Sequence, residues 1–329
     1  MLDFLMRRML LMIPTLFIVS GISFFVIQAP PGDFVTAHVQ RLEDRGQIVD
    51  REAIEAMRAR YGLDQPAHVQ YVRWIRSMFR GDLGMSFDWG APVSRVIARR
   101  IPNSLIISLF SFLFVYAVAI PIGMLSATRQ YSVADYFFTF VAFVGLGIPN
   151  FLFALVMLWV VYSMTGQVLI GLFSAEYVDA AWSWARFMDM LRHVWIPAII
   201  VGTAGTAKIV RVMRASLLDE LQKPYVMVAR AKGLSRSHVN YKYPFRIAIN
   251  PVVSTIGWTL PSLITGEMLV SLVLGLPTLA PIFLRALQMQ DMYLAGGIVF
   301  VLTLLTLLGT LISDILLGWI DPRIRFSSM

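Results

Sequence analysis

Long runs without charged residues alternate with short charged stretches along this chain. A helix needs about 20 apolar residues to cross a hydrocarbon core of roughly 30 Å. The candidate runs are bounded by charged residues at 8–33, 100–129, 135–176, 192–208, 246–285 and 291–321, and the last two contain one acid each, Glu267 and Asp314. The third run is broken by Pro149 and Gly166, and the fourth is about one turn short of a span. The pattern predicts an all-α polytopic membrane protein with six transmembrane helices.

The composition indicates that lipid, rather than water, surrounds much of this chain. Charged residues make up only 15% of the 329 residues, against roughly 25% in soluble proteins, and the mean hydropathy is +0.69. The absence of cysteine excludes disulfides and thiolate metal sites. The four scattered histidines show no metal-ligand spacing, so no metal site is expected.

The distribution of basic residues predicts orientation. Six spans place both termini on one side, and cytoplasmic loops carry the excess of Lys and Arg. Nine Lys and Arg fall between Lys208 and Arg246, whereas the short loops of the other side hold only Arg186, Arg192 and Arg285. The N- and C-termini are therefore expected in the cytoplasm. Membrane lipid is expected to surround the six spans.

Three regions follow from this topology: a first transmembrane helix at 1–29, an extracytoplasmic insertion at 30–100, and a five-helix core at 101–325 with a cytoplasmic loop at 215–246. A cleaved signal peptide is the alternative for the first run, which exceeds the usual apolar length and lacks a cleavage site. The insertion carries 11 basic and 9 acidic residues. Helical spacing, with stops at Gly62 and Gly81, predicts a small helical fold that either caps the bundle or contacts a delivery protein.

The stretch "PYVMVARAKGLSRSHVNYKYPFR" at 224–246 is basic and holds no acid. Pro224 suits the first turn of a helix, and Gly233 suits a left-handed stop with Leu234 packed back on Ala229. A helix of this length is too short to be stable alone and needs a docking surface. Ser235 is expected to cap a second helix.

Three interpretations of this stretch remain: a solvated basic loop, a DNA-binding helix-turn-helix, and a docking helix for a cytoplasmic protein. DNA binding conflicts with the spans that stand close on both sides, so no nucleic-acid partner is expected. A plain basic loop does not account for the small residues between Pro224 and Gly233.

Several motifs, in order along nearly the whole chain, resemble the permease subunits of ABC importers of the oligopeptide/dipeptide group, first-subunit type. They are "QYVRWIRSMFRGDLGMSF" at 70–87, "APVSRVIARRIPNSLIISL" at 91–109, "GIPNFLFAL" at 147–155, "ARAKGL" at 229–234, "FRIAINPV" at 245–252 and "DPRIRF" at 321–326.

The resemblance implies a multi-pass permease of the bacterial cytoplasmic (inner) membrane that moves a small solute by alternating access. It implies a second permease subunit, two cytoplasmic ATPase subunits and an extracytoplasmic substrate-binding protein. Oligopeptide or dipeptide is the implied cargo, with an oligosaccharide, an opine or nickel as alternatives. The residues implied in ATPase coupling are Tyr225, Ala229, Arg230, Ala231, Lys232, Gly233 and Leu234.

The chain departs from the group's pattern at two places. Met227 stands where the wider coupling pattern has an acid. Ser271 stands where the fifth span usually has a glutamate, and "PTLA" at 277–280 replaces a glycine-containing motif. Glu267 lies four residues before Ser271, on the same face of a helix one turn away. The acid has therefore moved along the helix rather than vanished.

Glu267 is the most informative residue inside the apolar runs, because an ionised acid in hydrocarbon costs a few kcal/mol. We expect it to face the bundle interior, together with Ser271 and with Asn150 at the break after Pro149. These three side chains are candidates for the translocation path. The structural alternative is an acid that is protonated or paired with polar neighbours.

Catalytic motifs are missing. There is no G-x-x-x-x-G-K-[ST] loop and no nucleophile–base–acid constellation, so the chain is not expected to be an enzyme. No cofactor is expected in this chain, and ATP with Mg²⁺ is expected on partner subunits. A membrane-tethered interaction protein is the alternative from another functional class. A secondary transporter would show repeat symmetry and more charge at the membrane midplane.

Overall fold

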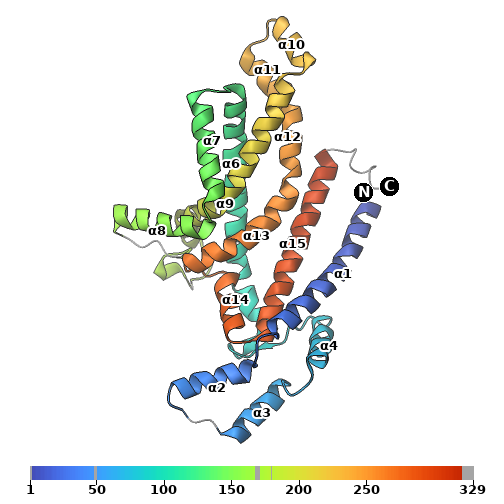
Figure 1. Cartoon of the computed structure of the whole chain (residues 1–329), viewed down its shortest axis with the longest axis vertical. Helices are drawn as coiled ribbons and strands as arrows, with labels where there is room; N and C mark the ends of the chain where they lie inside the picture. Colours follow the sequence, from blue (N-terminus) through green and yellow to red (C-terminus); the bar gives the residue numbers. More distant parts are fainter. Residues whose placement is uncertain (1, 48–49, 167–170, 179, 321–329) are drawn as a thin grey trace. The chain divides into compact units, whose positions relative to one another are not determined.

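Helices dominate the computed structural model, which describes residues 2–47, 50–166, 171–178 and 180–320 (Figure 1). The chain divides into two compact units, each built from segments distant in sequence. Of the described residues, the larger unit contains 2–5, those within 103–277, and 306–320, and the smaller contains those within 6–102 and 278–305. The sequence predicts three consecutive regions along the chain, and this division stays a prediction.

The smaller unit holds the first span and the insertion. Its elements are α1 (Leu2–Ile27), α2 (Phe34–Asp44), α3 (Arg51–Tyr61), α4 (Ala67–Met78), β1 (Met85–Ser86), β2 (Ala91–Pro92), α5 (Val93–Ala98), α14 (Leu279–Gln288) and the first part of α15 (Met292–Ile320). The two short strands pair antiparallel, with Met85 opposite Pro92.

The larger unit holds the remaining spans. Its elements are α6 (Ile101–Thr128), α7 (Val133–Gly147), α8 (Asn150–Thr165), the 3₁₀ turn η1 (Ala175–Tyr177), α9 (Trp184–Leu221), α10 (Pro224–Ala231), α11 (Arg236–Lys242), α12 (Pro244–Ser254), α13 (Ile256–Val273) and the last part of α15.

Within the described residues, five helices are long and apolar enough to cross a membrane, and α7 with α8 forms a sixth candidate bent by 110°. The expectation of six spans is confirmed when this bent pair is one span. The break falls at Pro149, which cannot donate a backbone hydrogen bond and disfavours a helical residue before it.

The fourth span differs from its prediction. The apolar run at 192–208 is short, yet α9 extends over 38 residues. Helical hydrogen bonding does not stop where an apolar run stops. Ser183 caps the start of α9 by accepting a hydrogen bond from the Arg186 amide, and the helix continues through Lys208 to Leu221.

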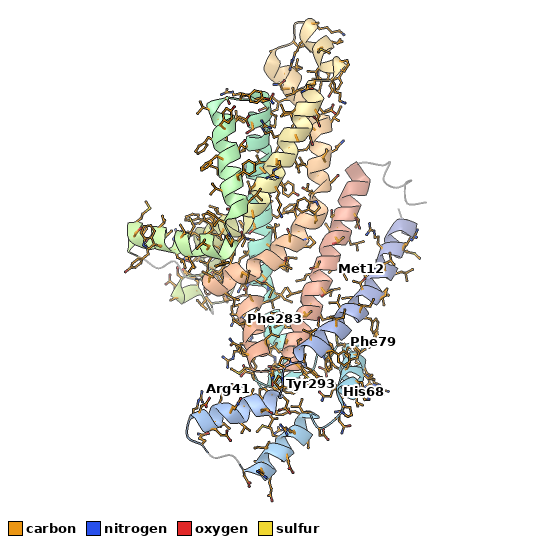
Figure 2. The ribbon with its side chains drawn as sticks, viewed as in Figure 1. Met12, Arg41, His68, Phe79, Phe283 and Tyr293 are labelled. Atoms are coloured by element: carbon orange, nitrogen blue, oxygen red, sulfur yellow. The ribbon has the colours of Figure 1, made fainter. Side chains whose placement is uncertain are left out.

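The predicted helices of the insertion are confirmed with shifted ends. Gly62 ends α3 in the left-handed conformation, at φ +68°. Pro66 lies just before α4 rather than in its first turn, and α4 ends at Met78, before Gly81. The sequence interpretation did not include α2 or the β1–β2 hairpin. The Phe87 ring, just after β1, packs edge-on against the ring of Tyr293, with 5.1 Å between the ring centroids. Tyr293 is labelled in Figure 2.

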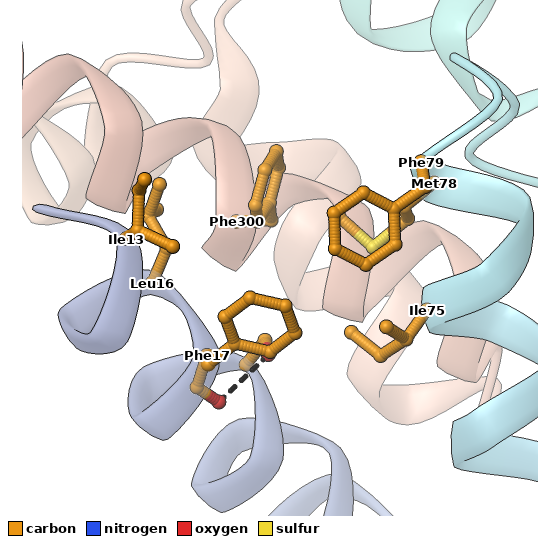
Figure 3. A pocket seen from close by; sticks show the side chains of 8 residues that line it. Ile13, Leu16, Phe17, Ile75, Met78, Phe79 and Phe300 are labelled. Carbon is orange, nitrogen blue, oxygen red and sulfur yellow. Dashed lines mark hydrogen bonds between the residues drawn. The ribbon is translucent and has the colours of Figure 1, made fainter. Parts of the chain in front are cut away.

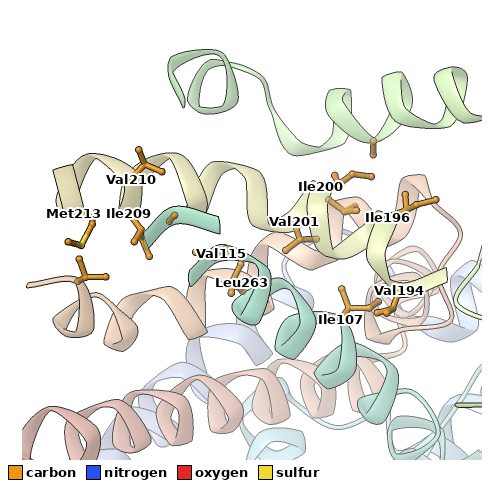
Figure 4. Close-up of a cluster of buried hydrophobic side chains, with 14 of the residues drawn as sticks. Ile107, Val115, Val194, Ile196, Ile200, Val201, Ile209, Val210, Met213 and Leu263 are labelled. Atoms are coloured by element: carbon orange, nitrogen blue, oxygen red, sulfur yellow. The ribbon is translucent and has the colours of Figure 1, made fainter. Parts of the chain in front are cut away.

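The core of the larger unit is an apolar cluster centred on α6, α9 and α13, with Ile107, Val115, Ile200, Val201 and Leu263 at its centre (Figure 4). Two glycines allow the close approach of α6 and α9. A Cβ at Gly202 would lie 2.8 Å from the Phe114 ring, and one at Gly123 would lie 2.6 Å from Met213 Cβ. Small residues at such crossings are the usual means of packing helices in membranes.

Candidate functional site: the docking segment and a buried polar seam

The helices of the segment around α10 begin and end at the residues that the sequence predicts. Pro224 occupies the first turn of α10, Gly233 follows the helix at φ +78°, and the Ser235 hydroxyl caps α11 by accepting from the His238 amide at 3.3 Å. A further helix, α12, starts at Pro244. The chain reverses after Gly233, and α10 and α11 pack against each other.

The buried side of α10 differs in part from the expectation. Val226 and Ala229 form a small core with Val239 of α11. Leu234, expected to pack on Ala229, is 37% exposed. The cause is a tertiary contact, because Val239 of α11 packs against α10 and covers Ala229. The sequence pattern alone does not reveal this contact.

The exposed side of α10 is apolar with a basic rim. Met227 and Val228 are 57% and 54% exposed, and Arg230, Ala231 and Lys232 are exposed beside them. In the sequence, Met227 stood out only as a departure from a pattern, and Val228 was not singled out. Exposed apolar side chains on a short helix are the signal that identifies them, because such patches mark interaction sites.

A hydrogen bond ties α10 to the end of α9. The Tyr225 hydroxyl donates to Glu220 Oε2 at 2.6 Å. Burial, with the neighbouring carboxylate, raises the pKa of Tyr225 to about 12, so the phenol stays protonated and remains a donor at physiological pH. A displacement of α10 is thereby linked to α9, along which α12 also packs.

Glu267 lies in a buried polar seam between α13 and α6. Its side chain is 2% exposed, and Oε1 accepts hydrogen bonds from Ser271 Oγ at 2.7 Å and from Ser104 Oγ at 3.4 Å. The expected same-face placement of Glu267 and Ser271 is thus observed. In this conformation both side chains are enclosed by protein, and their role in the translocation path stays a prediction.

The seam continues along α6. Ser108 and Ser111 are buried, and within the described residues their hydroxyls have no hydrogen-bond partner. Beyond them, the Tyr116 hydroxyl shares a 2.8 Å hydrogen bond with Thr255. Ser104, Ser108 and Ser111 recur at i, i+4 and i+7, so these three hydroxyl groups lie on one side of α6. Buried polar groups without a hydrogen-bond partner are rare in native structures.

Asn150 lies near the same helix but outside the seam. It is the first residue of α8 and is half-buried. Its Nδ2 lies 3.8 Å from where a Cβ on Gly266 would stand, next to Glu267 in sequence. The three candidate path residues are thus gathered around α13, and two of them share a hydrogen bond.

An ion pair joins α7 to α9 at the end of α9 nearer to α10. Arg214 donates from Nε and from a terminal nitrogen to the two oxygens of Asp135, both at 2.9 Å. The Tyr131 amide donates to the same carboxylate at 3.0 Å, and Asp135 is 3% exposed. No local pattern in the sequence indicates this pair, because 79 residues separate its members.

Among the described residues, no group of three or more His, Asp or Glu side chains lies close enough to hold a metal ion.

Comparison with known families places these features in context. The model of the family described as binding-protein-dependent transport system inner membrane component matches residues 119–326. The model of the N-terminal region of such membrane components matches residues 1–110.

Curated relatives match over nearly their whole length. The oligopeptide transport system permease protein AppB of Bacillus subtilis is 34% identical over 98% of this chain and 99% of its own. The dipeptide transport system permease protein DppB of Escherichia coli K12 is 32% identical over 99% of both chains. The oligopeptide permease protein OppB of Haemophilus influenzae is 30% identical over 99% of this chain and all of its own.

A solved structure shares the fold. A chain of the MetNI methionine ABC transporter in an inward-facing conformation matches with a TM-score of 0.53 at 15% identity, covering 69% of this chain and 96% of its own. At this identity, the likeness concerns the fold alone.

Proposed function

The chain belongs to the family of inner-membrane components of binding-protein-dependent transport systems, and on that premise we propose that it is a permease subunit of an ATP-driven importer of oligopeptides or dipeptides. The family is one of multi-pass inner-membrane permeases, which are not themselves catalytic. The observation that carries the proposal within this chain is α10, whose exposed face of Met227 and Val228 is rimmed by Arg230 and Lys232.

The proposed partners supply the functions that this chain does not carry. No phosphate-binding loop occurs in this chain, so ATP and Mg²⁺ bind to two separate cytoplasmic ATPase subunits. A similar second permease subunit completes the membrane domain as a heterodimer, and an extracytoplasmic binding protein delivers the cargo. The face of α10 fits a groove on an ATPase: apolar at its centre and basic at its edge, where an acidic rim gives complementary charge.

Coupling proceeds through contacts of this chain. ATP-driven movement of an ATPase displaces α10, and the Tyr225–Glu220 hydrogen bond carries the displacement to α9. The Asp135–Arg214 pair carries it on to α7, and the packing of α12 along α9 carries it towards α13. A change of state needs different contacts in the two states, and the exposed face of α10 supplies that difference.

The peptide cargo is supported by the printed names of the relatives AppB, DppB and OppB. Glu267 offers an acidic side chain for the amino terminus of a peptide when the seam opens. Its shift by one turn from the usual position of the acid, with Ser271 in that place, distinguishes this chain's path from the group's pattern.

The proposal is tested in proteoliposomes that contain the purified transporter with its co-purified subunits and its cognate binding protein. ATP-driven uptake of labelled dipeptides and oligopeptides is expected, with an oligosaccharide, an opine and Ni²⁺ as comparison cargoes. Gly233→Asp is expected to abolish uptake while the chain still inserts, because a side chain at φ +78° strains the turn and a new charge opposes docking. Gly46→Asp, at φ +78° in the insertion, is the matched control.

Two results would contradict the proposal. Normal uptake by Gly233→Asp, with normal ATPase stimulation, would remove α10 from coupling. Purification of the chain without any P-loop ATPase would instead favour a membrane-tethered interaction protein.

A further inference from the structure

An apolar groove of about 250 Å³ opens between α1, α4 and α15 in the smaller unit (Figure 3). Phe17 of α1, Phe79 after α4 and Phe300 of α15 surround it. The Phe17 and Phe79 rings lie 5.6 Å apart, and Phe79 is 74% exposed. Phe79, Phe17 and Ile13, which is 53% exposed, thus form part of a contiguous exposed apolar surface, and such a surface marks an interaction site.

The groove offers hydrocarbon contact and little else. Its one polar lining side chain is Ser20. The Ser20 hydroxyl already donates to the Phe17 carbonyl at 2.9 Å and shares a 3.0 Å hydrogen bond with Tyr71. The lining therefore offers no free hydrogen-bonding group to a polar ligand. A hydrocarbon chain is the occupant whose contacts with this lining are favourable.

Two walls of the groove are candidate membrane spans, and this identifies the solvent around it. The spanning window of α1 is only 11% buried, with Ile18 and Ile22 each 61% exposed. In a family of inner-membrane proteins, such a surface faces lipid acyl chains. The groove is therefore open to the bilayer.

The third wall, α4, has the character of a helix that lies in the membrane interface. Val72 and Phe79 are exposed apolar residues on one side. Arg76 and Arg80 are exposed next to them, and neither has an ion-pair partner among the described residues. The nearby Asp82 carboxylate accepts a hydrogen bond from the Gly84 amide. Arginine beside an apolar surface suits a phosphate whose acyl chain lies on that surface.

We propose that this groove is a binding site for an anionic phospholipid of the leaflet on the α2–α4 side, with one acyl chain between Phe17, Phe79 and Phe300 and its phosphate at Arg76 and Arg80. The lipid holds α4 against α1 and α15, and thereby fixes the insertion on the membrane surface.

The test uses the assembled transporter in nanodiscs that contain phosphatidylglycerol or phosphatidylcholine with a photoactivatable group on one acyl chain. Crosslinks mapped by peptide mass spectrometry are expected on α1, α4 and α15 around the groove, with phosphatidylglycerol labelling stronger. Arg76→Gln with Arg80→Gln is expected to lower phosphatidylglycerol labelling by about tenfold or more, since each interfacial basic residue contributes on the order of 1 kcal/mol. Labelling by phosphatidylcholine is expected to stay unchanged.

Two further variants sharpen the test. Ile13→Trp fills the groove from a position that is 53% exposed and is expected to remove labelling by both lipids. Arg51→Gln with Arg60→Gln changes two exposed arginines of α3 and is expected to leave labelling unchanged. Uniform labelling along α1 that Ile13→Trp does not affect, equal labelling by both lipids, or no labelling because another subunit covers the groove would each overturn the proposal.

Discussion

The Ser86 hydroxyl donates a 2.6 Å hydrogen bond to Asp291 Oδ2 across 205 residues of sequence. The same carboxylate accepts from the Asp88 amide at 3.1 Å and, through Oδ1, from the Leu294 amide in the first turn of α15. One buried acid therefore caps a spanning helix and also holds the β1–β2 hairpin. The "GDLGMS" motif thus has a structural role: its serine ties the insertion to the last span.

Removing either partner should loosen the insertion. Ser86→Ala is expected to cost about 1–3 kcal/mol, because a buried carboxylate loses a donor. Asp291→Ala should cost more, since it also leaves the α15 cap unmade. Thermal unfolding in detergent checks both, with Ser94→Ala, at an exposed position, as the control. An unchanged unfolding temperature for Asp291→Ala would contradict the role of this contact.

Asp291 also gives a pH dependence with a definite sign. Burial raises the pKa of its carboxyl above the ordinary value of 3.8, although hydrogen bonds from Ser86 and the backbone oppose the rise. The folded chain therefore keeps a proton that the unfolded chain has lost. The resulting stabilisation is fully present below pH 3.8 and is lost as pH rises through the folded pKa. Unfolding followed from about pH 4 to pH 7 should show this slope, and Asp291→Asn should lack it.

The Asp135–Arg214 pair predicts a larger effect on stability. The carboxylate is almost fully buried and accepts from both arginine nitrogens. Arg214→Gln is expected to destabilise by about 3–5 kcal/mol, because it leaves an uncompensated buried charge. Arg214→Lys should rescue only in part, since lysine cannot make the two-pronged contact.

Arg211 supplies the control for that pair. It lies one turn away on α9, is exposed, and stands over the Phe143 ring at 5.3 Å. Arg211→Gln should cost about 0.5–1 kcal/mol. Equal losses for Arg211→Gln and Arg214→Gln, measured by unfolding in detergent, would show that the buried pair has no special weight.

How far the sequence predicts this molecule depends on the range of each contact. Pro224, Gly233 and Ser235 act within a few residues, so the ends of α10 and the cap of α11 could be predicted. The Glu267–Ser271 contact follows from helical spacing alone. These features need no knowledge of the tertiary structure.

The rest depends on packing between distant segments. Leu234 was expected to pack on Ala229, but Val239 of α11 covers Ala229, and Met227 and Val228 face outwards. The length of α9 was underestimated because the helix continues through charged residues on both sides of the apolar run. Pairs such as Ser86 with Asp291 have no sequence periodicity that reveals them.

Tyr225 allows coupling to be separated from assembly. Tyr225→Phe keeps the ring and removes the hydrogen bond to Glu220. We expect ATP-driven uptake to fall by about tenfold, the equivalent of one charge-assisted hydrogen bond of roughly 1.4 kcal/mol. ATPase subunits should still co-purify, because the exposed face of α10 is unchanged. Tyr241→Phe, on an exposed side chain of α11, is the control. Loss of co-purification would assign Tyr225 to docking rather than to transmission.

The position of the buried acid gives the sharpest test of the seam. Glu267→Ala should lower peptide uptake strongly, whereas Glu267→Gln, which keeps the shape and the hydrogen bond from Ser271, should retain part of it. The double variant Glu267→Ser with Ser271→Glu moves the acid by one helical turn on the same face, to the place where the resembled group has it. If the carboxylate acts on the cargo, the double variant should transport with an altered preference among peptides of different length. Equal and near-normal uptake by Glu267→Ala and Glu267→Gln would remove the acid from the path and leave it a structural partner of Ser104 and Ser271. Uptake assays with a panel of labelled peptides, beside thermal unfolding of each variant, distinguish these outcomes, because a purely structural acid changes stability without changing preference.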